Sequence, residues 1–342
     1  MMRILVTGGA GFIGSHLVRH LLAGEEHQVV NLDALRYSGN LDNLKDLDGH
    51  PRYSFVQGDI CDAALVDRVV REERIEAIVN CAAETHVDRS IIEPGGFVRT
   101  DVVGTSVLLE AARACGVTRF VQVSTDEVYG DVPSGRSKES DPLAPRSPYS
   151  ASKAGADLLA LSYFTTYGFP VMVTRGSNTF GPNQYPEKFI PLFVTNALED
   201  QPLPLYGDGL QQRDWLYVQD HCEGIARVLE KGEPGQAYNV GVGEERPNRE
   251  VAESILGLLG KSRSLVRHVT DRPGHDRRYA LDCGKIAKLG WSPRFPFGEA
   301  LKATVAWYRD NAGWWQKIKS GEFRAYYEKM YGARLRDAQG GR

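Results

Sequence analysis

The chain has 342 residues, 42% of them hydrophobic, and a formal net charge of −3 at pH 7. This length suits one large or two modest domains, and the composition is sufficient to fill a core. The charge gives no electrostatic footprint for nucleic acid, and no apolar run is long enough to span a bilayer, so we expect neither a nucleic-acid nor a membrane partner.

The five cysteines are scattered, with no C-x-x-C pair and no zinc-ligand spacing, so no metal site is expected. They are typical of buried thiols in a reducing compartment. A glycine cluster begins at residue 8, so the apolar run at the amino terminus is too short for a signal peptide and is typical of a first strand. We therefore expect a cytoplasmic protein.

Short apolar runs alternate with amphipathic segments through the first half of the chain. Strands are predicted at residues 3–7, 27–32, 53–57, 77–81, 120–124 and 171–174. Helices are predicted at residues 12–23, 61–72, 97–115 and 148–167. Strands that are apolar on both faces and separated by helices are typical of an α/β fold with a parallel, doubly wound (Rossmann) sheet.

A glycine-rich turn, Gly8-x-x-Gly11-x-x-Gly14, joins the first strand to the first helix, and the second strand ends in Asp33. This pattern predicts a dinucleotide site, because glycines let the backbone approach a pyrophosphate and the helix end offers free N–H groups. Asp33 would bind the ribose hydroxyls and repel a 2′-phosphate, which favours NAD over NADP, although Arg36 nearby acts against that preference.

Five candidate residues follow directly on predicted strands: Gly8, Asp33, Asp59, Ala82 and Ser124. Ligands of doubly wound sheets bind outside the carboxyl ends of the strands. These positions therefore predict one shared site.

The stretch 124–130, Ser-Thr-Asp-Glu-Val-Tyr-Gly, places Asp126 and Glu127 side by side after a strand. Adjacent side chains in an extended strand point to opposite faces, so the two acids can serve one substrate only if the chain turns there. We predict a loop or a helical turn at this point. Two neighbouring carboxylates also repel, which raises one pKa and keeps that group protonated as an acid. The alternative is a pair of solvated surface acids.

Tyr149 and Lys153 stand at i and i+4 and share a helix face. A lysine cation near the phenol is expected to lower the pKa of Tyr149 from about 10 toward neutrality and make it a base. Among 15 tyrosines, roughly one such spacing arises by chance. The pair gains weight from lying beyond the 124–130 stretch in a chain with a dinucleotide pattern.

Beyond Asn178 the pattern is less regular. Helices are predicted near residues 190–199, 220–231, 248–259 and 297–310, and strands at 215–218, 238–240 and 265–268. We expect an NAD-binding Rossmann domain over residues 1–178, to which some later segments return, a smaller C-terminal α/β substrate-binding lobe over residues 179–330, and a tail over residues 331–342. Residues 337–342 are predicted to be disordered.

From residue 3 to about residue 310 the chain resembles the extended short-chain dehydrogenase/reductase superfamily, and within it the dTDP-glucose 4,6-dehydratases. The motifs that carry the resemblance lie at residues 7–15, 82–90, 124–130, 149–153, 186–191, 212–215 and 272–276. The glycine and Tyr/Lys motifs mark the superfamily, whereas the Asp126-Glu127 pair and the last three motifs mark the dehydratases.

The resemblance implies an NAD-dependent hydro-lyase that converts dTDP-glucose to dTDP-4-keto-6-deoxyglucose. C4 is oxidised, water leaves across C5 and C6, and hydride returns to C6. Glu127 is implied as the base at C5, Asp126 as the acid at O6, and Thr125 as a hydrogen-bond partner of O4 beside Tyr149, with Lys153 completing the catalytic set.

The resemblance also implies binding residues. For NAD they are Gly8, Gly11, Phe12, Ile13, Gly14, Asp33, Asp59, Ile60, Ala82, Ala83, Thr85, Thr100, Tyr149 and Lys153. For the nucleotide sugar they are Thr85, Thr125, Asn178, Lys188, Phe189, Pro204, Leu205, Tyr206, Arg213, Asn248, Arg272 and His275. Arg213 and Arg272 make physical sense as clamps on a diphosphate. Simpler alternatives are a local Arg213–Asp214 ion pair and a core position for Tyr206.

The chain departs from the family pattern at three positions. Thr179-Phe180 replaces Asn-Tyr, Asp101 replaces Asn, and Thr85 replaces a common Ser. None of these changes touches the acid, the base or the Tyr/Lys pair.

Other functions on the same scaffold remain as alternatives: a 4-epimerase, a UDP-glucuronate decarboxylase, a GDP-mannose 4,6-dehydratase or a non-catalytic NAD-binding scaffold. Asp126 discriminates, because the related enzymes commonly have Ser or Thr there. The resemblance further implies a homodimer held by a four-helix bundle. The resemblance does not determine whether the nucleotide base is thymine or uracil, or whether the product enters a housekeeping or a secondary-metabolite pathway.

Overall fold

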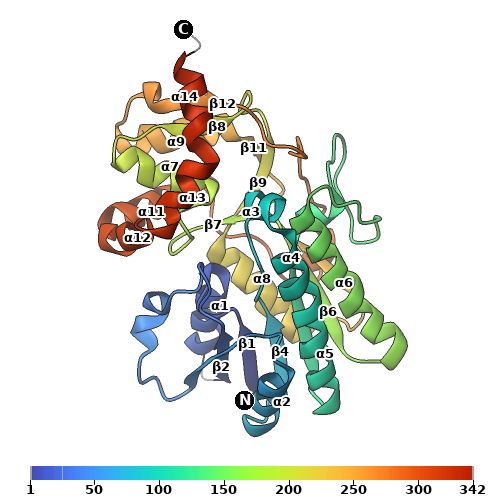
Figure 1. Ribbon diagram of the computed structural model, residues 1–342. Helices are drawn as coiled ribbons and strands as arrows, with labels where there is room; N and C mark the ends of the chain where they lie inside the picture. The colour runs from blue at the N-terminus through green and yellow to red at the C-terminus, as the bar shows by residue number, and fades with distance from the viewer. Residues whose placement is uncertain (1, 25, 341–342) are drawn as a thin grey trace.

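The computed structural model describes residues 2–24 and 26–340, and its centre is a seven-stranded sheet of order β10-β6-β5-β4-β1-β2-β3 (Figure 1). Its strands are β1 (Met2–Thr7), β2 (His27–Asp33), β3 (Tyr53–Gln57), β4 (Ala77–Asn80), β5 (Arg119–Thr125), β6 (Val171–Gly176) and β10 (Ala237–Val240). Every pairing within it is parallel, which confirms the predicted doubly wound sheet.

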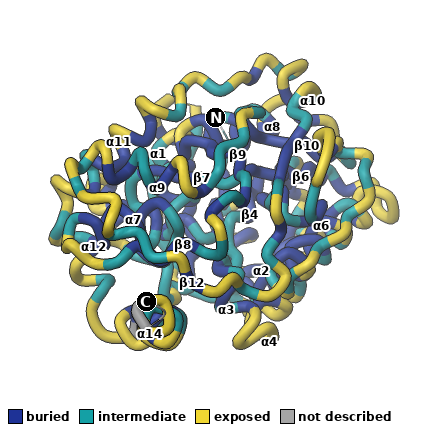
Figure 2. The backbone as a smooth tube through the Cα atoms, turned by 90° about the horizontal axis from the view of Figure 1, so that it is seen from above, coloured by how far each residue is buried: buried dark blue, intermediate teal, exposed yellow. Residues whose placement is uncertain are grey.

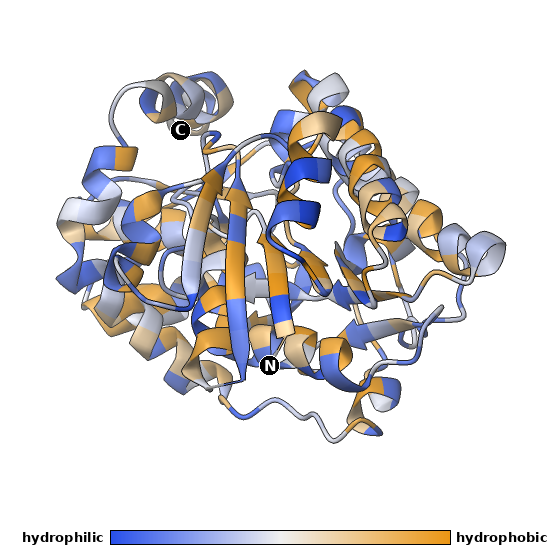
Figure 3. Ribbon diagram, turned by 90° about the horizontal axis from the view of Figure 1, so that it is seen from below, coloured by the Kyte–Doolittle hydropathy of each residue, from blue (hydrophilic) through white to orange (hydrophobic). Residues whose placement is uncertain are grey.

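Helices cover both faces of this sheet. They are α1 (Phe12–Ala23) and α8 (Val218–Lys231) on one side, and α2 (Ala63–Glu72), α5 (Thr105–Ala114) and α6 (Pro148–Tyr167) on the other. Along β1 the side chains alternate, so Ile4 and Val6 join the core under α1 and α8 while Leu5 joins the core under α2 and α5. Both faces of β1 are therefore apolar, and the strands carry long hydrophobic (orange) segments in Figure 3.

The ends of α6 show how local sequence fixes a helix that carries the Tyr/Lys pair. Ser147 caps its start, where the Ser147 and Ser150 side chains each accept a hydrogen bond from the other's backbone N–H, and Pro148 occupies the first turn. Gly168 ends the helix at φ +66°, in the left-handed region that glycine adopts freely. Both ends were predicted within a residue.

A second layer of elements lies over the carboxyl edge of the sheet, at the top of Figure 1. It contains a three-stranded sheet, β11-β9-β7, and a two-stranded sheet, β12-β8. The strands are β7 (Asn178–Phe180), β8 (Leu203–Tyr206), β9 (Gln212–Tyr217), β11 (Glu245–Pro247) and β12 (Val266–Val269). The helices are α7 (Phe189–Leu198), α9 (Asn248–Leu259), α11 (Phe297–Asp310), α12 (Ala312–Ile318), α13 (Glu322–Tyr327) and α14 (Ala333–Gly340), with the π-helical η5 (Glu328–Gly332) joining the last two.

The remaining short elements are the 3-10 helices η1 (Leu41–Leu47), η3 (Asp126–Tyr129) and η4 (Arg263–Leu265), and the helices α3 (Val87–Ile92), α4 (Pro94–Phe97) and α10 (Gly284–Ala287). Seen from above, the buried positions concentrate in the strands and inner helix faces, and the exposed ones in the outer loops (Figure 2). No helix within the described ranges is long and apolar enough to cross a membrane.

Two features differ from the sequence predictions. The helix predicted over residues 97–115 is present, but the π-helix η2 (Val98–Gly104) forms its first part. The predicted disorder of residues 337–342 is wrong for residues 337–340, which belong to α14; the last two residues lie outside the described part of the chain. This segment is ordered because Tyr331 is buried and Arg334 bonds to Tyr206.

Candidate active site

The two adjacent acids lie on a turn at the end of the central strand β5. Thr125 ends the strand and caps the 3-10 turn η3, which begins at Asp126. The Thr125 Oγ1 accepts a hydrogen bond from the backbone N–H of Glu127. Gly130 closes the turn at φ +76°. Because the chain has left the extended conformation, Asp126 and Glu127 both reach one cavity, which confirms the predicted turn.

Burial separates the ionisation of these two acids. Asp126 is 2% exposed, and its Oδ2 has no hydrogen-bond partner. Burial and the nearby Glu127 carboxylate raise the pKa of Asp126 well above its usual range. Burial also raises the pKa of Glu127, but the cations of Arg272 and Arg213 oppose that rise. The arrangement keeps Asp126 protonated and leaves Glu127 as the easier group to ionise.

Tyr149 and Lys153 lie in the first turns of α6, against the same strand end. Lys153 is buried and donates a hydrogen bond from Nζ to the Val123 carbonyl oxygen at 2.7 Å. The pKa of Tyr149 is raised, first by burial and then by nearby carboxylates, of which Glu127 is the strongest. The predicted lowering of the Tyr149 pKa is therefore wrong in direction, because burial and the neighbouring carboxylates raise it.

The glycine turn after β1 is packed too closely for side chains. A Cβ atom on Gly8, which has φ +67°, would lie 2.8 Å from the backbone of Ala82. A Cβ atom on Gly14 would lie 2.1 Å from the Gly8 carbonyl oxygen. The amino end of α1 is thus left open to the cavity, and its unpaired N–H groups fit a pyrophosphate.

Asp33 and Arg36 determine the charge of the cavity beside the glycine turn. The Asp33 carboxylate accepts hydrogen bonds from the backbone N–H groups of Ala10 at 2.9 Å and Leu35 at 2.8 Å. Arg36 pairs with Asp59 at 2.9 Å and with Glu84 at 2.8 Å. Since these carboxylates neutralise Arg36, it offers no free charge to a 2′-phosphate, and the arrangement favours NAD.

A first cavity collects the strand-end residues. The predicted cofactor residues that line it are Gly8, Gly11, Phe12, Ile13, Gly14, Asp33, Asp59, Ile60, Ala82, Ala83, Thr85, Thr100 and Tyr149. Ser124, Thr125, Asp126 and Glu127 line it as well. All five strand-end positions thus share one site, as predicted. Lys153 is not in the lining; its Nζ is bonded to the Val123 carbonyl oxygen.

A second cavity lies between the strand ends and the upper layer. The predicted substrate residues that line it are Asn178, Lys188, Phe189, Pro204, Tyr206, Arg213, Asn248, Arg272 and His275. Glu127, Asn178 and Lys188 line both cavities. Glu127 therefore lies where the two cavities meet, and Asp126, next to it on the turn, faces the first cavity.

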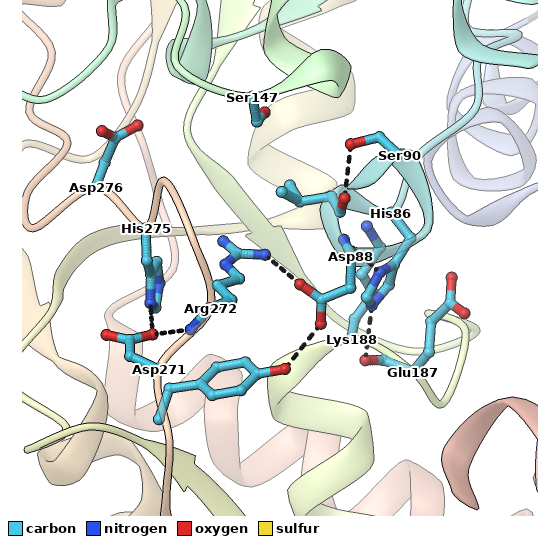
Figure 4. A network of polar contacts seen from close by, with 12 residues as sticks. His86, Asp88, Ser90, Ser147, Glu187, Lys188, Asp271, Arg272, His275 and Asp276 are labelled. Carbon is cyan, nitrogen blue, oxygen red and sulfur yellow. Dashed lines mark hydrogen bonds and ion pairs between the residues drawn. The ribbon is translucent and has the colours of Figure 1, made fainter. Parts of the chain in front are cut away.

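Positive groups and unpaired polar atoms gather in the second cavity. Figure 4 shows the polar contacts around two of the cations, Lys188 and Arg272. Arg272 donates to Asp88 at 2.8 Å, and its Nε is buried without a partner. Asn178 and Asn248 each have a buried Oδ1 without a partner. Buried polar atoms are rarely left unpaired, so these atoms indicate a polar ligand.

The simpler alternatives for two of these residues do not hold. The Arg213 guanidinium donates to the carbonyl oxygens of Gln212 and Asp276 at 2.8 and 2.9 Å, while the Asp214 carboxylate accepts from backbone N–H groups of Val242 and Gly243. No ion pair joins Arg213 to Asp214 in the described chain. Tyr206 is half-buried, packs against the main core and also lines the second cavity, so a core role alone does not describe it.

Two of the predicted site residues, Lys153 and Leu205, line neither cavity, and several residues that were not predicted do line one. The Leu205 side chain is in the hydrophobic core. The missed lining residues that carry polar groups include Tyr37, His86, Asp88, Glu187, His221, Tyr279 and Tyr331. His86 and Asp88 lie in the 82–90 motif and could have been found there, whereas Tyr331 comes from the segment predicted as a tail. In the part of the chain that the structure covers, no group of acidic, histidine and cysteine side chains could hold a metal ion.

Comparison with known proteins agrees with this geometry. The family model described as GDP-mannose 4,6 dehydratase matches residues 5–304. The dTDP-glucose 4,6-dehydratase of Streptomyces niveus is 54% identical over 325 residues, covering 93% of this chain and 96% of that protein. DesIV, a dTDP-glucose 4,6-dehydratase from Streptomyces venezuelae solved with NAD and dTDP bound, is 54% identical with a TM-score of 0.91, covering 93% of this chain and 100% of that chain.

More distant neighbours share the fold with other activities. A UDP-glucose 4-epimerase from Thermus thermophilus, solved with NAD, is 36% identical with a TM-score of 0.85, covering 91% of this chain and 100% of that chain. The chain belongs to the dTDP-glucose 4,6-dehydratase family, within the extended short-chain dehydrogenase/reductase superfamily.

Proposed function

We propose that this chain converts dTDP-glucose to dTDP-4-keto-6-deoxyglucose and water, with NAD as a cofactor that is regenerated in each cycle. One observation carries the proposal: Asp126 and Glu127 share one turn at the junction of a dinucleotide-type cavity and a cation-lined cavity. An enzyme that only oxidises and reduces C4 has no need of this acid pair.

The first step is oxidation at C4. NAD, when bound along the glycine turn, supplies the oxidation of C4 and the later return of hydride to C6. Tyr149 takes the proton of the 4-hydroxyl, while Thr125 accepts or donates a hydrogen bond at O4. Lys153, fixed by the Val123 carbonyl, adds positive charge near the phenol and favours its ionised form.

The second step is loss of water across C5 and C6. The new C4 ketone makes the C5 proton acidic, and Glu127 removes it; Glu127 gives a proton back to C5 when hydride returns to C6, which restores the base. Asp126 gives its proton to the departing 6-hydroxyl. These roles match their environments, because burial and the Glu127 charge hold Asp126 in the protonated form that a general acid needs.

Substrate binding is proposed for the second cavity. Arg213, Arg272 and Lys188 supply the positive charge for a diphosphate, and Asn178 and Asn248 supply unpaired amide oxygens. We infer a cofactor domain over residues 1–178 and a nucleotide-sugar lobe over residues 179–330, with α8 and β10 returning to the first sheet.

A product assay tests the proposal. Purified protein is incubated separately with dTDP-glucose and UDP-glucose, and the products are identified by NMR. The expected result is a 4-keto-6-deoxy sugar from dTDP-glucose. Formation of UDP-galactose with no 4-keto-6-deoxy product would instead identify a 4-epimerase.

We also propose a cytoplasmic homodimer. The five cysteines are unpaired, which suits a reducing compartment. Val103 on η2 and Leu158 and Tyr167 on α6 are exposed by 48, 59 and 54%, and these elements lie side by side. Pairing with a second copy would bury them in a four-helix bundle.

Light scattering at working concentration tests the dimer. The wild-type mass is expected to be twice that of the chain, and Leu158→Glu is expected to lower it toward one chain. Leu258→Glu is the matched control, because Leu258 is also exposed, by 44%, but lies on α9. A monomeric wild type contradicts the proposal.

A further inference from the structure

The carboxyl-terminal helices form a wall of the second cavity. Tyr331, in η5 between α13 and α14, is 5% exposed and lines that cavity. Its ring lies against the ring of Tyr206, with centroids 6.0 Å apart and planes at 36°. Tyr331 thus brings the carboxyl-terminal helices to the lining of the cavity.

A chain of hydrogen bonds runs from α14 into the cavity. Arg334 donates to the Tyr206 hydroxyl at 2.8 Å, and that hydroxyl donates to Asp88 Oδ2 at 2.9 Å. Arg272 donates to the other oxygen of Asp88 at 2.8 Å. The hydroxyl proton of Tyr206 is committed to Asp88, so its lone pairs are free to accept from Arg334. Each link in the chain therefore has a fixed direction.

A second, independent contact holds the same segment. The guanidinium of Arg89 lies between the rings of Tyr37 and Tyr326, 4.1 and 4.2 Å from their centroids, and pairs with Glu187 at 2.9 Å. The Tyr326 hydroxyl lies 3.3 Å from His86 Nδ1. The segment is therefore tied to the start of α3 as well as to the end of β8.

The chain of hydrogen bonds ends at Arg272, a cation in the lining of the second cavity. Arg272 uses one N–H on Asp88 and keeps a buried Nε–H without a partner. Asp88 is 2% exposed, and its two carboxylate oxygens bind different partners, Arg272 and Tyr206. The bond from Tyr206 fixes the orientation of the carboxylate, and the carboxylate in turn fixes the orientation of the Arg272 guanidinium. A guanidinium that is already oriented loses less freedom when an anion binds.

We propose that two residues near the carboxyl end belong to the nucleotide-sugar site: Arg334 is a positioning residue that orients Arg272 through Tyr206 and Asp88, and Tyr331 contacts the nucleotide. This inference rests on the proposed function, because it takes the occupant of the second cavity to be a nucleoside diphosphate sugar. It assigns a binding role to a segment whose sequence predicts only a tail.

Binding of dTDP to the holoenzyme by calorimetry, together with steady-state kinetics on dTDP-glucose, tests the proposal. Arg334→Ala is expected to raise the dTDP Kd and the KM for dTDP-glucose about tenfold, with kcat within about twofold, because the lost interaction aids binding in both ground and transition states. Arg336→Ala is the matched control: Arg336 lies on the same helix, is exposed and pairs with Glu328.

Two further variants separate positioning from charge. Arg334→Lys keeps the charge but loses the guanidinium geometry, so it is expected to bind dTDP almost as weakly as Arg334→Ala. Tyr206→Phe removes the middle link, and adding Arg334→Ala to it should cause no further loss. Full additivity of the two changes, or complete recovery in Arg334→Lys, would show that Arg334 does not act through Tyr206.

The outcomes also separate this inference from the function on which it rests. If the wild type neither binds dTDP nor turns over dTDP-glucose, the proposed function fails. If the wild type does both and Arg334→Ala matches it, the function stands and the role of the segment is wrong. Unchanged melting temperature and NAD content of the variants exclude a folding defect.

Discussion

Ser152 donates a hydrogen bond of 2.6 Å from its Oγ to Asp101 Oδ2, and it directly precedes Lys153 on α6. Asp101 lies on η2, is 1% exposed, and also accepts from the backbone N–H of Glu84 at 3.1 Å. Burial raises the pKa of Asp101 to about 6. The family usually has Asn at this position, so this chain places an additional titratable charge beside its Tyr/Lys pair.

Asp101→Asn is expected to move the acid limb of the kcat/KM–pH profile to lower pH by about half a unit to one unit. The Asp101 carboxylate is one of the charges that raise the pKa of Tyr149, so its removal lowers that pKa and more base is present at a given pH. The effect grows above pH 6, where Asp101 is ionised. Asp67→Asn on the exposed face of α2 is the control; a shift to higher pH would contradict the assignment.

Asp126→Asn is expected to lower kcat for the 4-keto-6-deoxy product by at least about a hundredfold. The amide keeps the shape of the side chain but has no acidic proton for the leaving hydroxyl. The affinity for dTDP and the amount of bound NAD should not change, which makes both internal controls. Unchanged turnover would remove Asp126 from the mechanism.

Arg175→Met is expected to lower the free energy of unfolding by about 3–5 kcal/mol in urea titrations. Arg175 pairs with Asp157 at 2.9 Å, and the two side chains are 3 and 0% exposed, so the variant leaves a buried carboxylate without its cation. Arg71→Met removes an exposed pair with Asp67 on α2 and serves as the control. Equal stability of the two variants would show that the buried pair contributes nothing.

Acid sensitivity between pH 6.5 and 4 is expected to depend on His221. Burial lowers its pKa from 6.5 to about 4 in the folded protein, so the unfolded chain binds more protons in this window and stability falls as the pH falls. His221→Gln should flatten this part of the curve by up to about 3 kcal/mol. His268→Gln, on an exposed strand residue, is the control, and parallel curves for wild type and His221→Gln would contradict the expectation.

The sheet and the cofactor side of the site could be predicted because local patterns determine them. Apolar runs separated by helices allow one sheet type, and the strand-end residues Gly8, Asp33 and Ser124 must then converge at one edge. The turn at Asp126 was predictable because an extended strand cannot turn two adjacent side chains to one ligand.

The remaining features depend on contacts between distant parts of the chain. Order in α14 depends on Arg334 meeting Tyr206, 128 residues earlier, and no local pattern announces that contact. Likewise, the spacing of Tyr149 and Lys153 indicates a lysine charge that would lower the pKa of Tyr149. It does not reveal the burial and the carboxylates that raise this pKa.

The pairing of β10 with β6 has a consequence for how the protein is made. Strand β6 borders β5, which carries the catalytic turn, and its outer edge stays unpaired until residues 237–240 have left the ribosome. The first 178 residues therefore lack the last strand of the sheet during synthesis. A protein released before residue 240 would expose the unpaired edge of β6, which could pair with another chain. Nascent chains of this enzyme should thus need protection from aggregation until the lobe between β7 and β10 has been translated.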